Sequence, residues 1–301
     1  MATRTSTTYS GNYMFPTELA NEMFLAVQGH SALAKLSGQK PIPFNGETIF
    51  TFSGVGEANI VGEGANKPAG EVTIAPKTIR PLKFVYQHRV SNEFMYNAEN
   101  RVPYLQTFAE AFSRVIARGL DIAAIHGINP ADLADASFKA TNSFDGLVTG
   151  NTVTYVAASV DSNIDAAVQM VMADGGEVNG IAMSPAAGAA LAAIKVNGVP
   201  QYPEFRFGQN PSAFYGMTSD VNGTVNVTGS ATGAQTDHVI VGDFRNAFRW
   251  GYSKNIPLEM IEYGDPDGLG DLKRTNEVVL RAEAFIGWGI LNADSFAIVK
   301  A

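Results

Sequence analysis

Apolar residues recur at helical spacing over residues 103–126, which is the clearest pattern in the chain. One face would carry Leu105, Phe108, Phe112, Val115, Ile116, Leu120 and Ala123, at steps of three and four residues. Pro103 suits the first helical position and Gly127 suits the end. Arg114, Arg118 and Asp121 would face outward. At 1.5 Å per residue, the sequence predicts a single helix about 35 Å long.

Residues 46–86 show the two-residue alternation of strands instead. Residues 47–53 and 72–75 alternate, and residues 85–90 continue the extended pattern. The connection 54–70 is long and rich in glycine, and loops of that length are usually functional or bound to a partner. A two-stranded hairpin alone is marginally stable in water. We therefore expect a long hairpin that leaves the body of the subunit and lies on another chain.

The beginning of the chain is polar. Residues 1–17 are rich in Thr and Ser and carry no acidic residue, so this segment cannot bury enough apolar surface to fold alone. Apolar positions after Pro16 predict a first helix. The pattern indicates an N-terminal arm that neighbouring chains hold in place.

The second half of the chain alternates helix and strand and then becomes mainly strand. Asp161 is placed to cap a helix that ends at Gly175, a buried strand follows at 178–183, and an alanine-rich helix runs to about Val196. Residues 208–237 predict loops and a hairpin, and residues 238–242 a short apolar strand. The last sixty residues predict antiparallel strands. The fold class is therefore α+β, and we find no internal repeat or flexible linker.

The composition indicates that part of the chain's surface is buried against other subunits. Hydrophobic residues make up 46% of the 301 residues and charged residues only 17%, below the quarter that is ordinary for a soluble globular protein. The cores of subunit interfaces are depleted in charge in the same way. A plain monomer with a core rich in glycine and alanine is the alternative. The net charge of −8 argues against tight, sequence-reading contact with nucleic acid, which needs a basic stripe.

No residue pattern indicates an enzyme. There is no cysteine, and the four histidines lack the spacing of a helical zinc site. The loop 265–271 begins like a calcium loop, but Leu269 and Asn276 stand where an EF-hand needs an oxygen ligand and a glutamate. A turn-rich loop is the simpler interpretation, with a looser calcium site as the alternative. The sequence predicts no catalytic, cofactor-binding or metal-binding residues and no cofactor. It also carries no signal peptide and no apolar run long enough to span a membrane.

The order of these parts resembles the Hong Kong 97-type major capsid protein of tailed bacteriophages, over essentially the whole chain. Local stretches that resemble the family's patterns are Ile60-Val-Gly-Glu-Gly64, Lys77-Thr-Ile-Arg-Pro-Leu-Lys83, Val90-Ser-Asn-Glu93, Ala182-Met-Ser-Pro185, Val241-Gly-Asp-Phe-Arg-Asn-Ala-Phe248, Val279-Leu-Arg-Ala-Glu-Ala-Phe285 and Asn292-Ala-Asp-Ser-Phe-Ala-Ile-Val299. Each is weak alone, and their order carries the resemblance.

The resemblance implies an architecture and a function. Its parts would be an N-terminal arm (1–30), an extended E-loop (46–86), a P domain (87–144) with the spine helix 103–126, an A domain (145–243), and a terminal antiparallel sheet (244–301) shared by the P and A domains. The subunits would form hexamers and pentamers of an icosahedral shell around double-stranded DNA, without sequence-specific contact. Partners would be a separate scaffolding protein, a portal and a candidate decoration protein, with no membrane. The protein would be assembled in the host cytoplasm and end in the virion.

The resemblance also implies contacts between subunits, because the E-loop of this family lies across a neighbour's spine helix. The expected contact residues are Glu57, Ile60, Val61, Glu63, Lys67, Lys77, Arg80, Arg114 and Arg118. Glu57 or Glu63 would meet Arg114 or Arg118. Some family members cross-link a lysine to an asparagine, and Lys67 or Lys77 could be that lysine, but no partner motif matches.

The sequence leaves three alternative functions. The first is the shell of an encapsulin-type compartment, which shares this fold but needs an inner pocket for a cargo peptide, and the sequence identifies none. The second is a carbohydrate-binding or tail β-protein, which the long helix argues against. The third is a hydrolase, for which no site is found.

Overall fold

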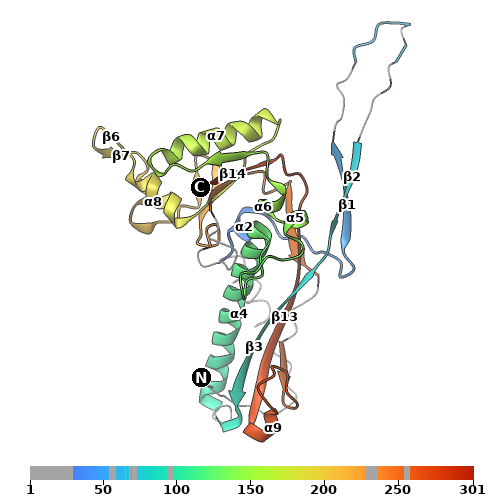
Figure 1. The fold of residues 1–301 in the computed structure, drawn as a ribbon, viewed down its shortest axis with the longest axis vertical. Coiled ribbons are helices and arrows are strands. Elements are labelled where there is room, and N and C mark those ends of the chain that lie inside the picture. The colour runs from blue at the N-terminus through green and yellow to red at the C-terminus, as the bar shows by residue number, and fades with distance from the viewer. Residues whose placement is uncertain are drawn as a thin grey trace.

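The described part of the subunit is built around a long helix, a four-stranded sheet, a six-stranded sheet and a projecting hairpin (Figure 1). The computed structural model describes residues 30–53, 59–64, 66–67, 69, 73–93, 98–227, 236–253 and 258–301. The helices are α2 (Ala32–Leu36), α4 (Ala98–His126), α5 (Lys139–Asn142), α6 (Phe144–Leu147), α7 (Val160–Ala173), α8 (Pro185–Ala193) and α9 (Leu272–Thr275), with 3-10 turns η1 (Ala157–Ser159) and η2 (Pro203–Gly208).

Fourteen strands are described. They are β1 (Glu47–Ser53), β2 (Thr73–Ile79), β3 (Leu82–Ser91), β4 (Thr152–Thr154), β5 (Gly180–Met183), β6 (Lys195–Val196), β7 (Val199–Pro200), β8 (Ala213–Phe214), β9 (Met217–Val221), β10 (Asp237–Gly242), β11 (Phe248–Tyr252), β12 (Leu258–Ile261), β13 (Glu277–Ile290) and β14 (Phe296–Lys300). The mixture of helices and strands confirms the predicted α+β class.

Helix α4 forms the long axis of the subunit, beside β3 and β13 (Figure 1). Most of its predicted apolar face is buried, with Phe112 and Leu120 both 0% exposed, but the prediction is wrong for Val115, which is 45% exposed. The side chain of Leu105 lies outside the described residues. The helix ends where predicted, because Gly127 has a left-handed φ of 63°. The predicted start at Pro103 is wrong, since the helix already begins at Ala98.

Strand β13 is the centre of a four-stranded sheet. It pairs antiparallel with β3 along one edge, and with β11 and β12 along other parts of its length. The even positions from Val278 to Ile290 are all buried, in one core cluster with Phe112 and Ile116 of α4. The odd positions face the other side of the sheet.

A second sheet of six strands has the order β4-β14-β10-β5-β9-β8. One face carries Ile181, Val239 and Val299, and it packs with the buried sides of α7 and α8. The other face carries Ile240 and Ile298, and it joins the core that contains α4. Both faces are covered, which explains why β10 and β14 have continuous apolar runs.

Other sequence predictions are corrected in detail. Helix α7 begins at Val160 after Ser159, so Asp161 lies in the first turn and is not the cap. Helix α8 ends at Ala193 rather than near Val196. The strands of residues 244–301 need no correction: β11 to β13 lie in the four-stranded sheet, and β14 pairs with β10 and β4 in the six-stranded sheet. The predicted helix after Pro16 and nearly all of the arm lie outside the described residues.

Candidate inter-subunit surfaces

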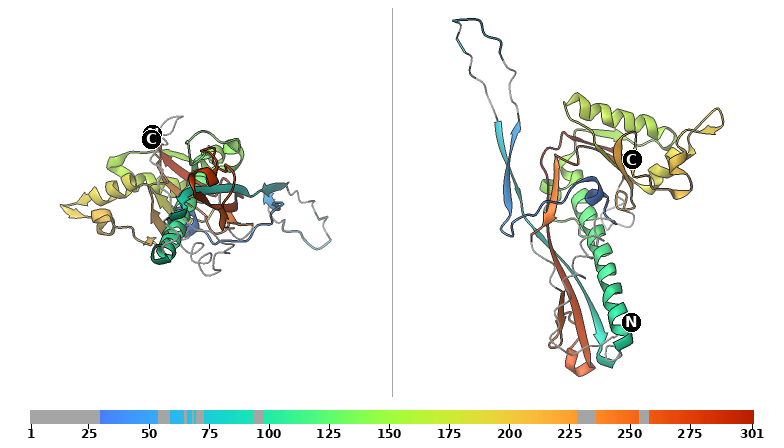
Figure 2. Two further views of the ribbon diagram at one scale, coloured as in Figure 1. Left: turned by 90° about the horizontal axis from the view of Figure 1, so that it is seen from below. Right: turned by 180° about the vertical axis from the view of Figure 1, so that it is seen from behind.

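The β1–β2 hairpin projects from the body of the subunit, as Figure 1 and the right-hand view of Figure 2 show. Its strands pair antiparallel from Glu47–Ile79 to Ser53–Thr73. Cross-strand partners share a face, so Phe50, Ile74 and Pro76 lie on the same side of the ribbon. Phe50 is 61% exposed and Ile74 is 56% exposed. The hairpin therefore presents an apolar face that its own chain does not cover.

Beyond the paired strands, the described residues of the hairpin tip are exposed. Ile60 is 104% exposed and Val61 is 38% exposed, and Glu63 and Lys67 are also exposed. Glu57 lies outside the described residues. The aliphatic side chains of Ile60 and Val61 are thus exposed to solvent at the tip of the hairpin.

The base of the hairpin belongs to the core of the subunit. Ile42 and Ile79 are almost fully buried and pack on the glycines of β13. A Cβ added at Gly289 would lie 2.7 Å from Cγ1 of Ile79, so glycine is needed for this close approach. Arg249 and Glu47 form an ion pair at 2.9 Å. The hairpin is thus anchored at one end and uncovered at the other.

Two of the predicted contact residues also lie near the base. The ammonium of Lys77 donates a hydrogen bond to the carbonyl oxygen of Thr141 in the same chain, at 3.1 Å. Partial burial lowers the pKa of Lys77. Arg80 is exposed in the short link between β2 and β3. Lys77 is therefore partly engaged within its own subunit.

Helix α4 offers a basic edge to solvent. Arg114 and Arg118 are exposed as predicted, one turn apart, and Val115 between them is 45% exposed. A groove of about 520 Å³ lies between α4 and β3, and its apolar lining includes Phe84, Val115 and Phe138. This side of α4 combines positive charge with an apolar groove.

The prediction that Asp121 faces outward is wrong. Asp121 is 0% exposed and accepts hydrogen bonds from the backbone N–H groups of Ala32 and Leu33, at 2.8 and 3.2 Å, and from the hydroxyls of Ser31 and Thr224. Burial raises its pKa to about 6, although all of these donors favour the ionised form. A charged residue can lie on the inner face of α4 because the start of α2 supplies free N–H donors there.

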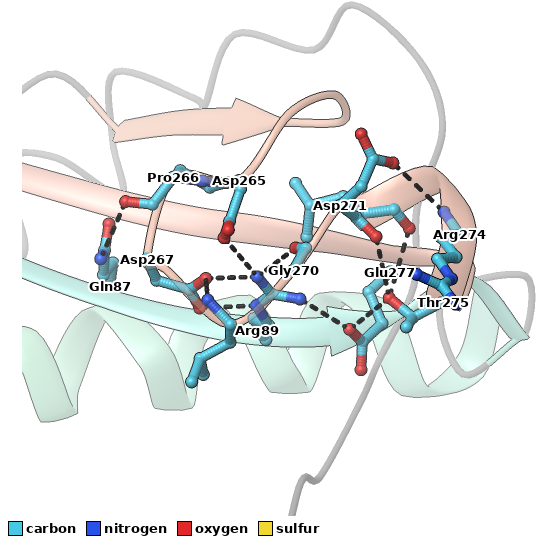
Figure 3. A network of polar contacts seen from close by, with 12 residues as sticks. Gln87, Arg89, Asp265, Pro266, Asp267, Gly270, Asp271, Arg274, Thr275 and Glu277 are labelled. Carbon is cyan, nitrogen blue, oxygen red and sulfur yellow. Dashed lines mark hydrogen bonds and ion pairs between the residues drawn. The ribbon is translucent and has the colours of Figure 1, made fainter.

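The acidic loop 265–271 is organised by an arginine of the sheet (Figure 3). Arg89 contacts the carboxylates of Asp265, Asp267 and Glu277, and it also donates to the carbonyl oxygen of Gly270 at 2.7 Å. Its hydrogen bonds with Asp267 hold the pKa of that carboxyl below its usual range. The positive charge that a calcium ion would bring is thus supplied by Arg89, and the loop closes over the face of the sheet opposite α4.

A second polar cluster lies where α4 ends. His126 is fully buried, and its Nδ1 lies 3.1 Å from Oδ2 of Asp145 on α6 and 3.4 Å from Oδ2 of Asp237 on β10. Burial alone lowers the pKa of His126, but the two aspartates outweigh burial and raise it to about 9. Burial and the charge of Asp145 raise the pKa of Asp237 to about 6. Spacing along the sequence could not reveal this cluster, because three separate elements bring it together.

A serine and a histidine also meet, but they do not form a catalytic pair. The hydroxyl of Ser184 lies 3.2 Å from Nδ1 of His238. Ser184 is 1% exposed and caps α8, where its oxygen accepts the N–H of Ala187. His238 stacks on Tyr155 at 3.6 Å between ring centroids. A buried capping serine cannot reach a substrate.

The chain matches the model of the phage capsid family over residues 11–301. The chain belongs to the phage capsid family. A chain from Mycobacterium phage Ogopogo is similar in structure, with a TM-score of 0.78 and 33% identity, covering 100% of this chain and 96% of that one. A chain from Gordonia phage Cozz has a TM-score of 0.73 and 26% identity over 89% and 85% of the two chains. No curated protein matches.

More distant structures share the fold of this capsid protein. A chain described as the capsid of a native GTA particle has a TM-score of 0.62 at 15% identity, covering 100% of this chain and 95% of that one. Family and fold together confirm the predicted structural role: the chain is a major capsid protein that assembles into a multi-subunit shell, located in the virion. The encapsulin alternative is not favoured. Among the described residues no helix has the length and hydrophobicity to cross a membrane.

Proposed function

We propose that this capsid protein forms hexamers and pentamers of an icosahedral shell that encloses double-stranded DNA, with the Hong Kong 97-type division of labour. Residues 46–86 act as the E-loop, α4 as the spine helix of a P domain at 87–144, and residues 145–243 as the A domain, with the strands of 244–301 shared. Residues 1–30 act as the arm. A separate scaffolding protein and a portal take part in assembly in the host cytoplasm, and a decoration protein is a candidate partner.

The observation that carries this proposal is the uncovered apolar face of the hairpin. Phe50 and Ile74 are more than half exposed on a ribbon that stands away from both cores. Full burial of an aliphatic or aromatic side chain is worth about 1.5–3 kcal/mol. A neighbouring subunit that covers this face would recover that free energy at every copy in the shell. The groove between α4 and β3 offers a matching apolar surface on the neighbour.

The test is microscopy of assembled particles. We expect the expressed chain, with its scaffolding protein where one is required, to form closed shells built from five-fold and six-fold rings, and particles from infected cells to contain DNA. A chain that stays a monodisperse monomer under every assembly condition would contradict the proposal. Shells that hold protein cargo and no genome would favour the encapsulin-type compartment.

Charge pairing at the hairpin gives a finer prediction. Glu63 at the tip and Arg114 and Arg118 on α4 are all exposed, so each is free to meet a neighbour. An exposed pair is worth only about 0–1 kcal/mol, but a shell repeats it at every subunit. We expect Glu63→Arg to lower the yield of shells, and Arg114→Glu or Arg118→Glu in the same chain to restore part of it. Single reversals that leave the yield unchanged would show that these charges are simply solvated.

A further inference from the structure

We propose that His126, Asp145 and Asp237 bind a divalent transition-metal cation, for which zinc is the best fit. These three residues form a group whose nitrogen and oxygen ligand atoms all lie within 4.8 Å of one another. One imidazole and two carboxylates are a donor set that suits zinc, with a fourth position left for water. The proposal concerns stability and is independent of how the subunits assemble.

The orientation of the imidazole supports a ligand at Nδ1. Nε2 of His126 lies 3.0 Å from the carbonyl oxygen of Thr224. A carbonyl oxygen only accepts hydrogen bonds, so Nε2 carries a proton and Nδ1 faces the two aspartates. Metal-binding histidines characteristically donate their other ring N–H to a backbone carbonyl in this way.

The second observation is an unsatisfied oxygen. Asp237 is 2% exposed, and within the described residues its Oδ2 has no hydrogen-bond partner although it points toward Nδ1. A single proton on Nδ1 can be donated well to only one carboxylate, and Asp145 is the nearer, at 3.1 Å. A buried acceptor without a partner costs roughly as much as a lost hydrogen bond. A cation would satisfy Nδ1 and both oxygens at once.

The spacing of the ligand atoms fits the same occupant. Bonds of about 2.0–2.1 Å to zinc in a tetrahedral site place neighbouring ligand atoms roughly 3.3 Å apart. The distances from Nδ1 to the two carboxylate oxygens, 3.1 and 3.4 Å, bracket this value. The side chain of Asp145 is 17% exposed and gives the site an opening to solvent.

The position of the site explains what the cation would do. His126 is the last residue of α4, Asp145 belongs to α6, and Asp237 begins β10 of the six-stranded sheet. A metal bound to all three would tie the long helix to the second sheet.

The test uses the purified full chain and measures metal directly. The chain is stripped with a chelator, incubated with zinc, desalted, and assayed for metal by elemental analysis, and the melting temperature is followed with and without zinc. We expect about one zinc per subunit and a melting temperature several degrees higher. Cobalt(II) in place of zinc should give the visible absorption of a four-coordinate site with nitrogen and oxygen ligands.

Variants separate a built site from incidental binding. Asp145→Asn and His126→Gln should lose the bound zinc and the cobalt absorption, whereas His30→Gln, which changes an exposed histidine, should keep both. Asp145→Asn is included because asparagine has nearly the same shape as aspartate and Asp145 is the most exposed of the three ligands. We therefore expect this variant to fold, so that a loss of metal reports on the site itself. Wild-type protein that retains no more zinc than Asp145→Asn, with a melting temperature that zinc leaves unchanged, would overturn the proposal in favour of a proton shared by the three residues.

Discussion

Two long antiparallel ribbons, β1–β2 and β3–β13, differ in what covers them. The β3–β13 ribbon pairs from Ser91–Glu277 to Leu82–Ile286, and α4 covers one face while the loop held by Arg89 covers the other. The β1–β2 ribbon has equally regular pairing, yet Phe50 and Ile74 on it are exposed. Backbone pairing therefore does not distinguish a strand of the subunit core from a strand that contacts other subunits. The burial of the side chains within the subunit does distinguish them.

The largest expected difference is at two arginines at either end of β3. Arg89 is buried among three carboxylates, and Arg80 is exposed. We expect Arg89→Met to lower the free energy of unfolding by about 3–5 kcal/mol, because it leaves buried carboxylates without their partner. Arg80→Met should change it by less than about 0.5 kcal/mol. Chemical denaturation of both variants measures this, and equal losses would contradict the distinction between covered and uncovered regions.

A second difference concerns two isoleucines of the same strand, β2. Ile79 is 1% exposed against the glycines of β13, and Ile74 is 56% exposed. Ile79→Ala should destabilise the subunit by about 2–5 kcal/mol, through lost burial and the cavity left behind. Ile74→Ala should leave subunit stability nearly unchanged and lower the yield of shells. A large loss of subunit stability at Ile74 would mean that the hairpin is packed along its whole length.

The smallest expected effect is the pH dependence of the loop 265–271. Arg89 lowers the pKa of Asp267 in the folded state below its value of about 3.9 in the unfolded chain. The stability from this pair is therefore complete above about pH 4 and is lost as the pH falls through the lower folded pKa. Denaturation from pH 7 down to pH 3 should show a steeper loss for the wild type than for Asp267→Asn. Parallel curves would show that the pair contributes nothing.

The local sequence pattern predicted the helices and strands better than it predicted the tertiary contacts of their side chains. The spacing from Phe108 to Ala123 predicted the buried helix face correctly except at Val115, which is exposed. The alternation at residues 47–53 correctly predicted a hairpin strand, because it depends only on residue period. Ile60 and Ile74 are exposed, which agrees with the expectation that the hairpin leaves the body of the subunit.

What failed depends on contacts between distant segments. Asp121 is a charged residue on an inner face, and only the folded chain brings it the N–H groups of Ala32 and Leu33. The partner of the acidic loop, Arg89, lies well over a hundred residues upstream of Asp267. His126 meets Asp237 from a different sheet. No spacing rule connects such residues, so the sequence alone predicted neither the arginine-held loop nor the histidine cluster.

The most direct measurement replaces the tip of the hairpin and follows folding and assembly separately. Because Ser53 pairs with Thr73, residues 54–72 can be replaced by Asn-Gly, a two-residue turn that closes the remaining ribbon. Melting and sedimentation are then compared with the wild type at the same concentration. We predict a melting temperature of the subunit that stays within about 2–4 °C, equivalent to roughly 1 kcal/mol, together with loss of shells. Shells that still form at the wild-type yield, or a subunit that no longer folds, would contradict the assignment of this hairpin to contacts between subunits.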